Sequence, residues 1–253
     1  MPVFALWSAP RARSTAFFRS MLERGDMLAL HEPIEGLIHF GSTEVDGRVF
    51  DTPGSLVAWL RDETEAVTVF LKETTDSRVH EVVLADRRFL AEGRHAFLIR
   101  RPEEIAASLH ALITTFEQPY RDLRVDDIGL ETLLALYTAV RDAGGNCPVV
   151  IDSDDLVARP EATMAAYRAA VELPFIPEAL TWTPGERAEW GRSARWHADV
   201  SVSSGFVPRE RRDTRAVESS DELRLFAAHH VPFYEQLHAQ RLDVAAWDRS
   251  GDS

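Results

Sequence analysis

The chain has 253 residues, of which 45% are hydrophobic and 27% charged, and its formal net charge is −13 at pH 7. This composition is typical of a soluble globular protein with one large core, and the negative charge argues against a general nucleic-acid or anionic-membrane surface. No stretch approaches the roughly 20 apolar residues of a membrane helix, and no secretory signal begins the chain, so we expect a cytoplasmic protein.

Short apolar runs alternate with helical patterns along the chain. This alternation predicts an α/β fold, a three-layer sandwich with a central, mostly parallel sheet. Residues 3–8 are expected to form the first strand, and residues 16–24 the helix that follows it. We predict further strands at 27–30, 67–71, 96–99 and 149–151, and further helices at 103–116, 129–143, 160–171 and 221–241.

Two segments show no sustained period. Residues 36–64 alternate glycine, acidic and apolar residues, so we expect an irregular excursion with a short helix at 56–60. Residues 181–220 concentrate tryptophans and arginines, a composition that suits a flap over an anion. We expect both segments to belong to a single domain at 1–253, either as covers over the site or as ordinary surface insertions.

Cysteine and lysine are nearly absent. Cys147 is the only cysteine, which excludes disulfides within the chain and thiolate metal clusters and suits a reducing compartment. Of the 28 basic residues 27 are arginine, and Lys72, at the end of an apolar run, is the only lysine. Lys72 has two interpretations. Either the composition of the chain has drifted towards arginine and Lys72 is a remaining lysine that pairs with Glu73 at the surface, or Lys72 is a functional residue that acts as a compact point charge.

The turn between the first predicted strand and its helix, residues 8–18, carries the first chemical signal. A strand–loop–helix turn points backbone amides outward, and the helix N-terminus adds partial positive charge, so such a turn attracts phosphate. Arg11, Arg13, Ser14 and Thr15 add donors here. Because the glycines and the lysine of an ATP-type loop are missing, an ordinary ATP or GTP hydrolase is a poor match. Alternatively, Ser14 caps the helix and the arginines are solvated.

The stretch SAPRARSTAFFRSML resembles the 5′-phosphosulfate loop of the sulfotransferases that use PAPS, 3′-phosphoadenosine 5′-phosphosulfate. In that family an arginine at a strand end, a proline two residues on and a serine eight residues on hold the donor's 3′-phosphate. Here FLIRRPEEIAASLHAL places Arg100, Pro102 and Ser108 at those positions. The resemblance implies that the donor is bound by the loop and this second motif, through Arg11, Ala12, Arg13, Ser14, Thr15, Arg100 and Ser108.

The likeness extends along most of the chain, especially towards bacterial sulfotransferase-like proteins of the kind once grouped with branched-chain aminotransferases. HEP at 31–33, FLKETT at 70–75 and VVIDSDDLVARPEATM at 149–164 match stretches that form or follow strands. RWHADVSVSSGF at 195–206 resembles a stretch beside the nucleotide. It implies nucleotide contacts from Trp196, Ser204, Gly205 and Phe206, and from the basic residues Arg209, Arg211 and Arg212.

The resemblance also implies a mechanism. Sulfuryl transfer, like phosphoryl transfer, depends on positioning and positive charge, and no metal is expected. Lys72 would reach the bridging oxygen of the donor. Relatives take the acceptor proton with a histidine shortly after this lysine or with a carboxylate after the second strand. Thr74 occupies the histidine's place, so Glu32 is the leading base and His31 the second candidate. Alternatively, His31 ends a strand and Glu32 holds a loop arginine.

The acceptor stays open: a sugar, a small alcohol, a phenol or a group tethered to a carrier protein. Sulfation could be the end product or could activate a leaving group in biosynthesis, and the oligomeric state is not indicated. Candidate pocket-lining residues are Phe40, Trp59, Phe116 and Tyr120. Two other functions remain open. One is a non-catalytic homologue that binds nucleotide or a partner protein, and the other is a small-molecule P-loop kinase with a magnesium site near 152–155.

Overall fold

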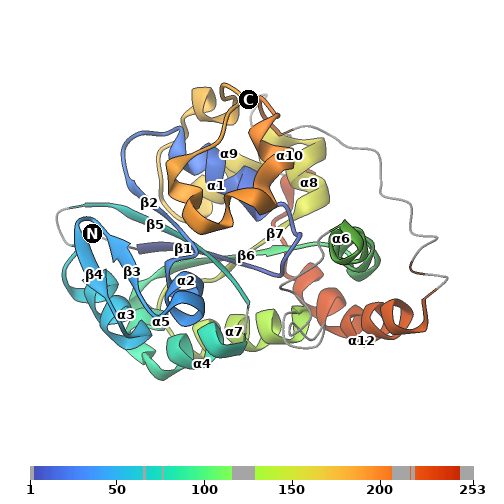
Figure 1. The fold of residues 1–253 in the computed structure, drawn as a ribbon, viewed down its shortest axis with the longest axis horizontal. Helices are drawn as coiled ribbons and strands as arrows, with labels where there is room; N and C mark the ends of the chain where they lie inside the picture. Colours follow the sequence, from blue (N-terminus) through green and yellow to red (C-terminus); the bar gives the residue numbers. More distant parts are fainter. Residues whose placement is uncertain are drawn as a thin grey trace.

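The computed structural model describes residues 3–64, 67–75, 77–115, 129–206, 217 and 220–245. Its central sheet has five strands in the order β2-β5-β1-β6-β7, and every pairing between them is parallel (Figure 1). The strands are β1 (Val3–Ser8), β2 (Leu28–His31), β5 (Val69–Thr74), β6 (Arg94–Ile99) and β7 (Val149–Asp152). The predicted α/β sandwich is therefore confirmed.

The central strands are buried on both faces. All six residues of β1 are buried, as expected for a parallel sheet covered by helices on each side. Because side chains alternate along a strand, Ala5 and Trp7 enter one hydrophobic core while Phe4 and Leu6 enter the other. The continuous apolar run of β1 thus serves two cores at once.

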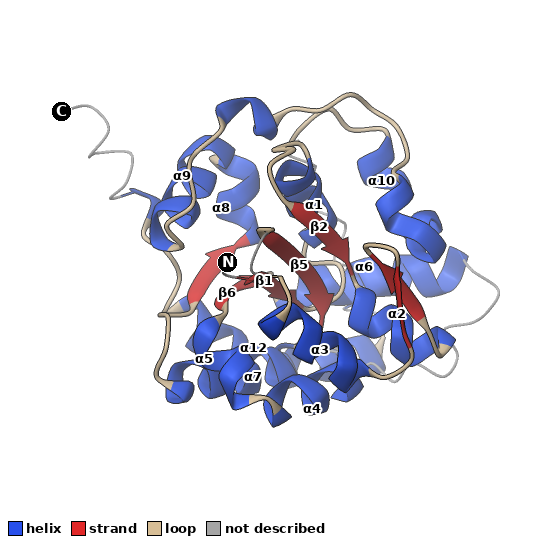
Figure 2. Ribbon diagram, turned by 90° about the vertical axis from the view of Figure 1, so that its left-hand side faces the viewer, coloured by secondary structure: helices blue, strands red, loops and turns tan. Residues whose placement is uncertain are grey.

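Helices cover both faces of the sheet (Figures 1 and 2). One layer contains α1 (Ser14–Leu22), α8 (Ser153–Ala158), α9 (Pro160–Ala170) and α10 (Ala198–Ser201). The opposite layer contains α3 (Pro53–Asp62), α4 (Ser77–Ala85), α5 (Arg87–Glu92), α7 (Leu130–Ala143) and α12 (Asp221–His238), with α6 (Pro102–Thr115) packed on α12. Among the described residues, no helix has both the length and the apolar character needed to cross a membrane.

The expectation of an irregular segment at 36–64 is wrong. This stretch contains most of α2 (Pro33–Phe40), an antiparallel hairpin of β3 (Thr43–Val45) and β4 (Arg48–Phe50), and α3. The hairpin turns through Asp46 and Gly47, both with positive φ, the backbone that an Asp-Gly turn favours. Three-residue strands are too short to show a period of two. The predicted helix at 56–60 is the middle of α3, which begins earlier because Thr52 caps it.

The described part of 181–220 is also more regular than expected. It begins after η2 (Pro177–Leu180) and contains the 3-10 helix η3 (Ala188–His197) and then α10. Trp182 and Trp190 are buried rather than exposed on a flap. Their burial, with a β-bridge between Thr181 and Gly205, fixes the segment on the α1 side of the sheet. Residues 207–216, 218 and 219 lie outside the described residues.

Candidate active site

The carboxyl ends of the parallel strands gather the predicted motifs at one edge of the sheet, where such folds bind ligands. β1 leads into the 8–18 turn, β2 ends at His31, and β6 leads into the second motif. β5 runs through Lys72 to Thr74. The parallel pairing therefore brings together motifs that are far apart in sequence.

The loop before α1 has a constrained backbone. Arg11 and Arg13 have φ values of 64° and 69°, in the left-handed region that side chains rarely adopt. Arg13 is the N-cap residue of α1 and contributes no side-chain cap, and Ser14 is the first helical residue. The alternative that Ser14 caps the helix is thus wrong. The first amides of α1 are not capped by the residue that precedes them, which suits an anion at this end.

The loop contacts the second motif directly. Arg11 donates from Nε to Ser108 Oγ at 3.0 Å, and Arg100 donates to the Arg11 carbonyl at 2.8 Å. Arg100 is buried and also pairs with Glu104 at 2.8 Å, the ordinary structural role of such an arginine. Ala12, between Arg11 and Arg13 in sequence, is fully buried. The two motifs form one unit that holds arginines beside the helix start.

Arg13 points towards the end of β7. It donates to the Ser153 carbonyl at 3.0 Å and lies 3.5 Å from a carboxylate oxygen of Asp154. Asp154 also pairs with Arg101. Cations and carboxylates are therefore interleaved here, so a bound anion would compete with Asp154 and Glu104 for the arginines.

Lys72 and Glu32 form a partly buried ion pair. Their elements are adjacent because His31 of β2 is in register with Lys72 of β5, and the Glu32 amide donates to the Lys72 carbonyl at 2.7 Å. Lys72 Nζ donates to Glu32 Oε1. Burial opposes the charge on Glu32, but Lys72 and then His31 lower the pKa of Glu32 to about 2. Glu32 is therefore ionised at neutral pH.

Glu73 does not pair with Lys72. Successive residues of a strand face opposite sides, and Glu73 instead accepts from the Ile34 amide at 2.6 Å and the Glu35 amide at 3.4 Å, at the start of α2. Burial, and then the charge of Glu35, raises the pKa of Glu73 well above its usual value. The surface pair of Lys72 with Glu73 is thus wrong, and Glu73 has a structural role.

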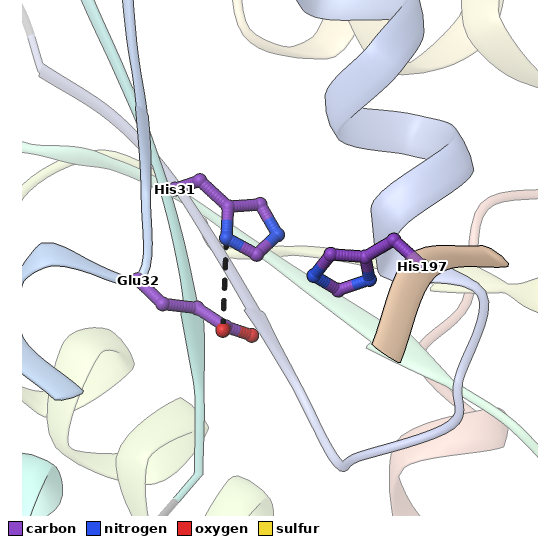
Figure 3. A group of neighbouring side chains, drawn as sticks. All are labelled: His31, Glu32 and His197. Carbon is purple, nitrogen blue, oxygen red and sulfur yellow. Dashed lines mark ion pairs between the residues drawn. The ribbon is translucent and has the colours of Figure 1, made fainter. Parts of the chain in front are cut away.

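His31 lies between Glu32 and a residue that the sequence did not single out, His197 (Figure 3). His31 Nδ1 is 3.6 Å from Glu32 Oε2, and the His31 and His197 rings meet edge to face at 4.7 Å. His197 Nδ1 lies 3.1 Å from Thr15 Oγ1, and its Nε2 lies 3.2 Å from Ser193 Oγ. His197 thus joins the loop to the pair formed by His31 and Glu32.

Burial sets the charge of both histidines. It lowers the pKa of His31 to about 4 and that of His197 to about 3, so both imidazoles are neutral at neutral pH. A neutral imidazole can accept a proton or bind a metal ion through the lone pair of one nitrogen. The only sequence signal for His197 was its place beside Trp196 in the RWH stretch.

Glu35 is a second carboxylate that sequence reasoning missed. It accepts a hydrogen bond from Thr74 at 2.7 Å, and burial, followed by the charge of Glu32, raises its pKa. The Glu35 carboxylate therefore lies next to Thr74, the residue at the place of a histidine in some relatives. Two acids with oppositely shifted pKa values line this edge.

The remaining predicted contacts divide into three groups. The Trp196 carbonyl accepts from Arg11 at 3.5 Å, so it lies at the loop. Three others pack around Trp182: the Ser204 carbonyl accepts from its amide, Gly205 bridges Thr181, and Phe206 stacks edge to face on its ring. The residues outside the described part of the chain are Arg209, Arg211, Arg212, Phe116 and Tyr120.

Two candidate pocket residues are described. Trp59 is a core residue packed on Phe50 with ring centroids 5.5 Å apart. Phe40 is 53% exposed at the end of α2.

Comparison with known proteins identifies the family. The sulfotransferase domain family matches residues 1–241. The chain belongs to this family. A curated protein of Arabidopsis thaliana, branched-chain-amino-acid aminotransferase-like protein 2, is 29% identical to this sulfotransferase domain over 219 residues, which cover 81% of the chain. The domain spans only 36% of that relative's length.

A solved structure supports the same fold. The sulfotransferase domain of the olefin synthase from Synechococcus PCC 7002 superposes with a TM-score of 0.60 at 13% identity. The match covers 90% of this sulfotransferase domain and 94% of that one. At this identity the likeness shows the shared fold, and the roles of individual residues rest on the contacts described above.

Proposed function

We propose that the chain transfers a sulfuryl group from PAPS to a hydroxyl of a small-molecule or carrier-tethered acceptor and releases PAP. The observation that carries the proposal is that the loop before α1, the β6–α6 motif and the Lys72–Glu32 pair lie at one edge of the sheet. Arg11 contacts Ser108, and Lys72 of β5 contacts Glu32, the residue after β2. A donor with phosphates at both ends and a reactive sulfate needs this combination of groups.

The donor half would hold PAPS at two points. The amides at the start of α1, with Arg11, Arg13 and Thr15, would bind the 5′-phosphosulfate. Arg100 and Ser108 would bind the 3′-phosphate. Since Arg100 already pairs with Glu104, binding would exchange part of that pairing for a charge-assisted contact with phosphate.

The transfer step would use the Lys72–Glu32 pair. The acceptor oxygen attacks sulfur in line, the bond from sulfur to the PAP phosphate oxygen breaks, and Glu32 takes the acceptor's proton. Lys72 neutralises the charge that develops on the departing phosphate. Because the ammonium holds Glu32 before the donor arrives, its movement to the phosphate frees the carboxylate.

We also propose a single domain at 1–253 that acts in the cytoplasm. The support is the exposed free thiol of Cys147, which suits a reducing compartment. A biosynthetic role, in which sulfation activates a hydroxyl as a leaving group, is prompted by the olefin synthase that contains the solved relative.

A second candidate is a homologue that binds nucleotide without catalysis. The observation in its favour is that the charged groups of the site satisfy one another: Lys72 pairs with Glu32, and Arg100 pairs with Glu104. A site that only binds PAP could keep the first pair intact.

A kinase is disfavoured by the surroundings of Asp152. One of its oxygens accepts from the Asp154 amide at 2.7 Å, and the other accepts from the Tyr234 hydroxyl at 2.9 Å. Asp154 in turn pairs with Arg13 and Arg101. These carboxylates act as a helix cap and as partners of arginines, a poor arrangement for magnesium.

The decisive experiment combines calorimetry with PAP and transfer from radiolabelled PAPS to a panel of sugars, alcohols, phenols and carrier-bound hydroxyls. Transfer that persists in EDTA supports the enzyme. PAP binding without transfer to any acceptor supports the second candidate. A chain that does not bind PAP contradicts the proposal.

A further inference from the structure

Three side chains at the base of the site form a set of potential metal ligands. His31, Glu32 and His197 each offer one nitrogen or oxygen atom, and these atoms lie within 4.8 Å of one another (Figure 3). They come from the end of β2, the residue after it, and the end of η3. Two imidazoles and a carboxylate form a ligand set used by zinc sites that keep a fourth position open.

The spacing is close to that of a coordinated ion. Ligand atoms at zinc–ligand distances of about 2 Å lie roughly 3.3 Å apart around a tetrahedral ion. His31 Nδ1 and Glu32 Oε2 are already 3.6 Å apart. The other ligand distances would shorten by a movement of the His197 ring, which meets the His31 ring edge to face.

The position of Ser193 supports this choice of ligand atoms. Its hydroxyl oxygen lies 3.5 Å from His31 Nδ1 and 3.2 Å from His197 Nε2, so both nitrogens face the same hydroxyl. Thr15 Oγ1, 3.1 Å from His197 Nδ1, would orient the ring as an outer partner does at metal sites, and His197 Nε2 would exchange its contact with Ser193 for the ion.

Lys72 limits the affinity without blocking the site. Its ammonium holds Glu32 Oε1, whereas Oε2 faces His31. A divalent ion on Oε2 would share the carboxylate with a cation on the other oxygen. The expected site is therefore weaker than a structural zinc site.

We propose that His31, Glu32 and His197 bind Zn²⁺, and that the bound ion inhibits the chain by occupying the carboxylate that takes the acceptor's proton. The metal site itself is independent of the reaction. Only the inhibition rests on the proposed function. The bound ion would therefore inhibit transfer at the general base, and transfer itself would not require it.

Binding is tested with Co²⁺ and Zn²⁺ alone, in a Cys147→Ser background so that the exposed thiol cannot contribute. Co²⁺ should produce visible absorption with one equivalent bound, and Zn²⁺ should displace it. His197→Ala should weaken Co²⁺ binding at least tenfold, and so should His197→Gln, which keeps a side chain of similar length. The matched control is His229→Ala, because the His229 side chain is exposed on α12 and pairs with Glu131. Loss of binding in both His197 variants, with circular dichroism unchanged, supports the site.

Two results would overturn the metal site: absence of Co²⁺ binding, or equal affinities of the His197 and His229 variants. These outcomes do not depend on any transfer activity, so they are separate from a failure of the proposed function. If transfer is detected, Zn²⁺ should inhibit it, EDTA should restore it, and inhibition should be relieved by acceptor rather than by PAPS. Zn²⁺ binding with full transfer activity would overturn the inhibitory role.

Discussion

The donor half of the site comes from two stretches that are each continuous in sequence, the β1–α1 loop and the β6–α6 motif, and they meet through Arg11, Ser108 and Arg100. The base half instead joins side chains from β2, β5 and η3, and its central contact is the pair of Lys72 with Glu32. The donor half is built from backbone geometry and the base half from side-chain charge. Substitutions should therefore affect binding in the first and turnover in the second.

The largest effect is expected for Glu32→Gln, which keeps the shape of the side chain but removes the proton acceptor. Transfer should fall by about 10²–10⁴-fold, while affinity for PAP stays nearly unchanged. Steady-state transfer and calorimetry measure the two quantities. Glu35→Gln is the matched control, because it can still accept from Thr74. If Glu35→Gln is inactive and Glu32→Gln is active, the roles of the two carboxylates are reversed.

Lys72→Arg tests whether the base half needs a compact charge. The guanidinium is larger and planar and would still pair with Glu32, but it should fit the bridging oxygen poorly. We expect transfer to fall on the order of 10²-fold with PAP affinity retained. Lys72→Met should lower the rate at least as far. Wild-type rates in the arginine variant would remove Lys72 from the transfer step.

The histidines extend the comparison to stability. His95 lies near the start of β6, where its Nδ1 accepts from Trp7 Nε1 at 3.0 Å, and burial lowers its pKa to about 4 from 6.5. The unfolded chain therefore binds this proton first as the pH falls, and stability is lost between pH 6.5 and about 4.

The loss due to His95 should be about 3 kcal/mol, because folding lowers the pKa of its side chain from 6.5 to about 4. Urea unfolding at several pH values should show a smaller acid-induced loss for His95→Gln than for the wild-type chain. Identical slopes in the two chains would mean that His95 is not held neutral.

Arg100→Ala should have the smallest effect and should act on binding. Loss of a charge-assisted contact to phosphate is expected to weaken PAP binding by about 2 kcal/mol, roughly 30-fold. The control is Arg101→Ala, because Arg101 is more exposed and pairs with Asp154. Calorimetry should separate the two variants. Equal affinities would mean that Arg100 only holds Glu104 and the loop.

Sequence patterns were informative where a feature depends on neighbouring residues. Residues 3–8 form β1 as predicted, and the turn, its arginines and the helix after it lie in one stretch. Short or capped elements escaped prediction, since the strands of the β3–β4 hairpin have only three residues each and α3 begins at a cap. The same limit explains why 36–64 was predicted to be irregular.

What the sequence determined by itself is the α/β architecture, because local backbone preferences and apolar periodicity specify it. The two motifs proposed to bind phosphate also lie in continuous stretches, and the family resemblance pointed to them. Only the tertiary structure decided the partners in the base half. Whether Lys72 meets Glu32 or Glu73 depends on the register of β2 with β5 and on the face that each residue presents. His197 reaches His31 from more than 160 residues away in sequence, through the packing of η3 on the sheet. No local pattern records a contact of that kind.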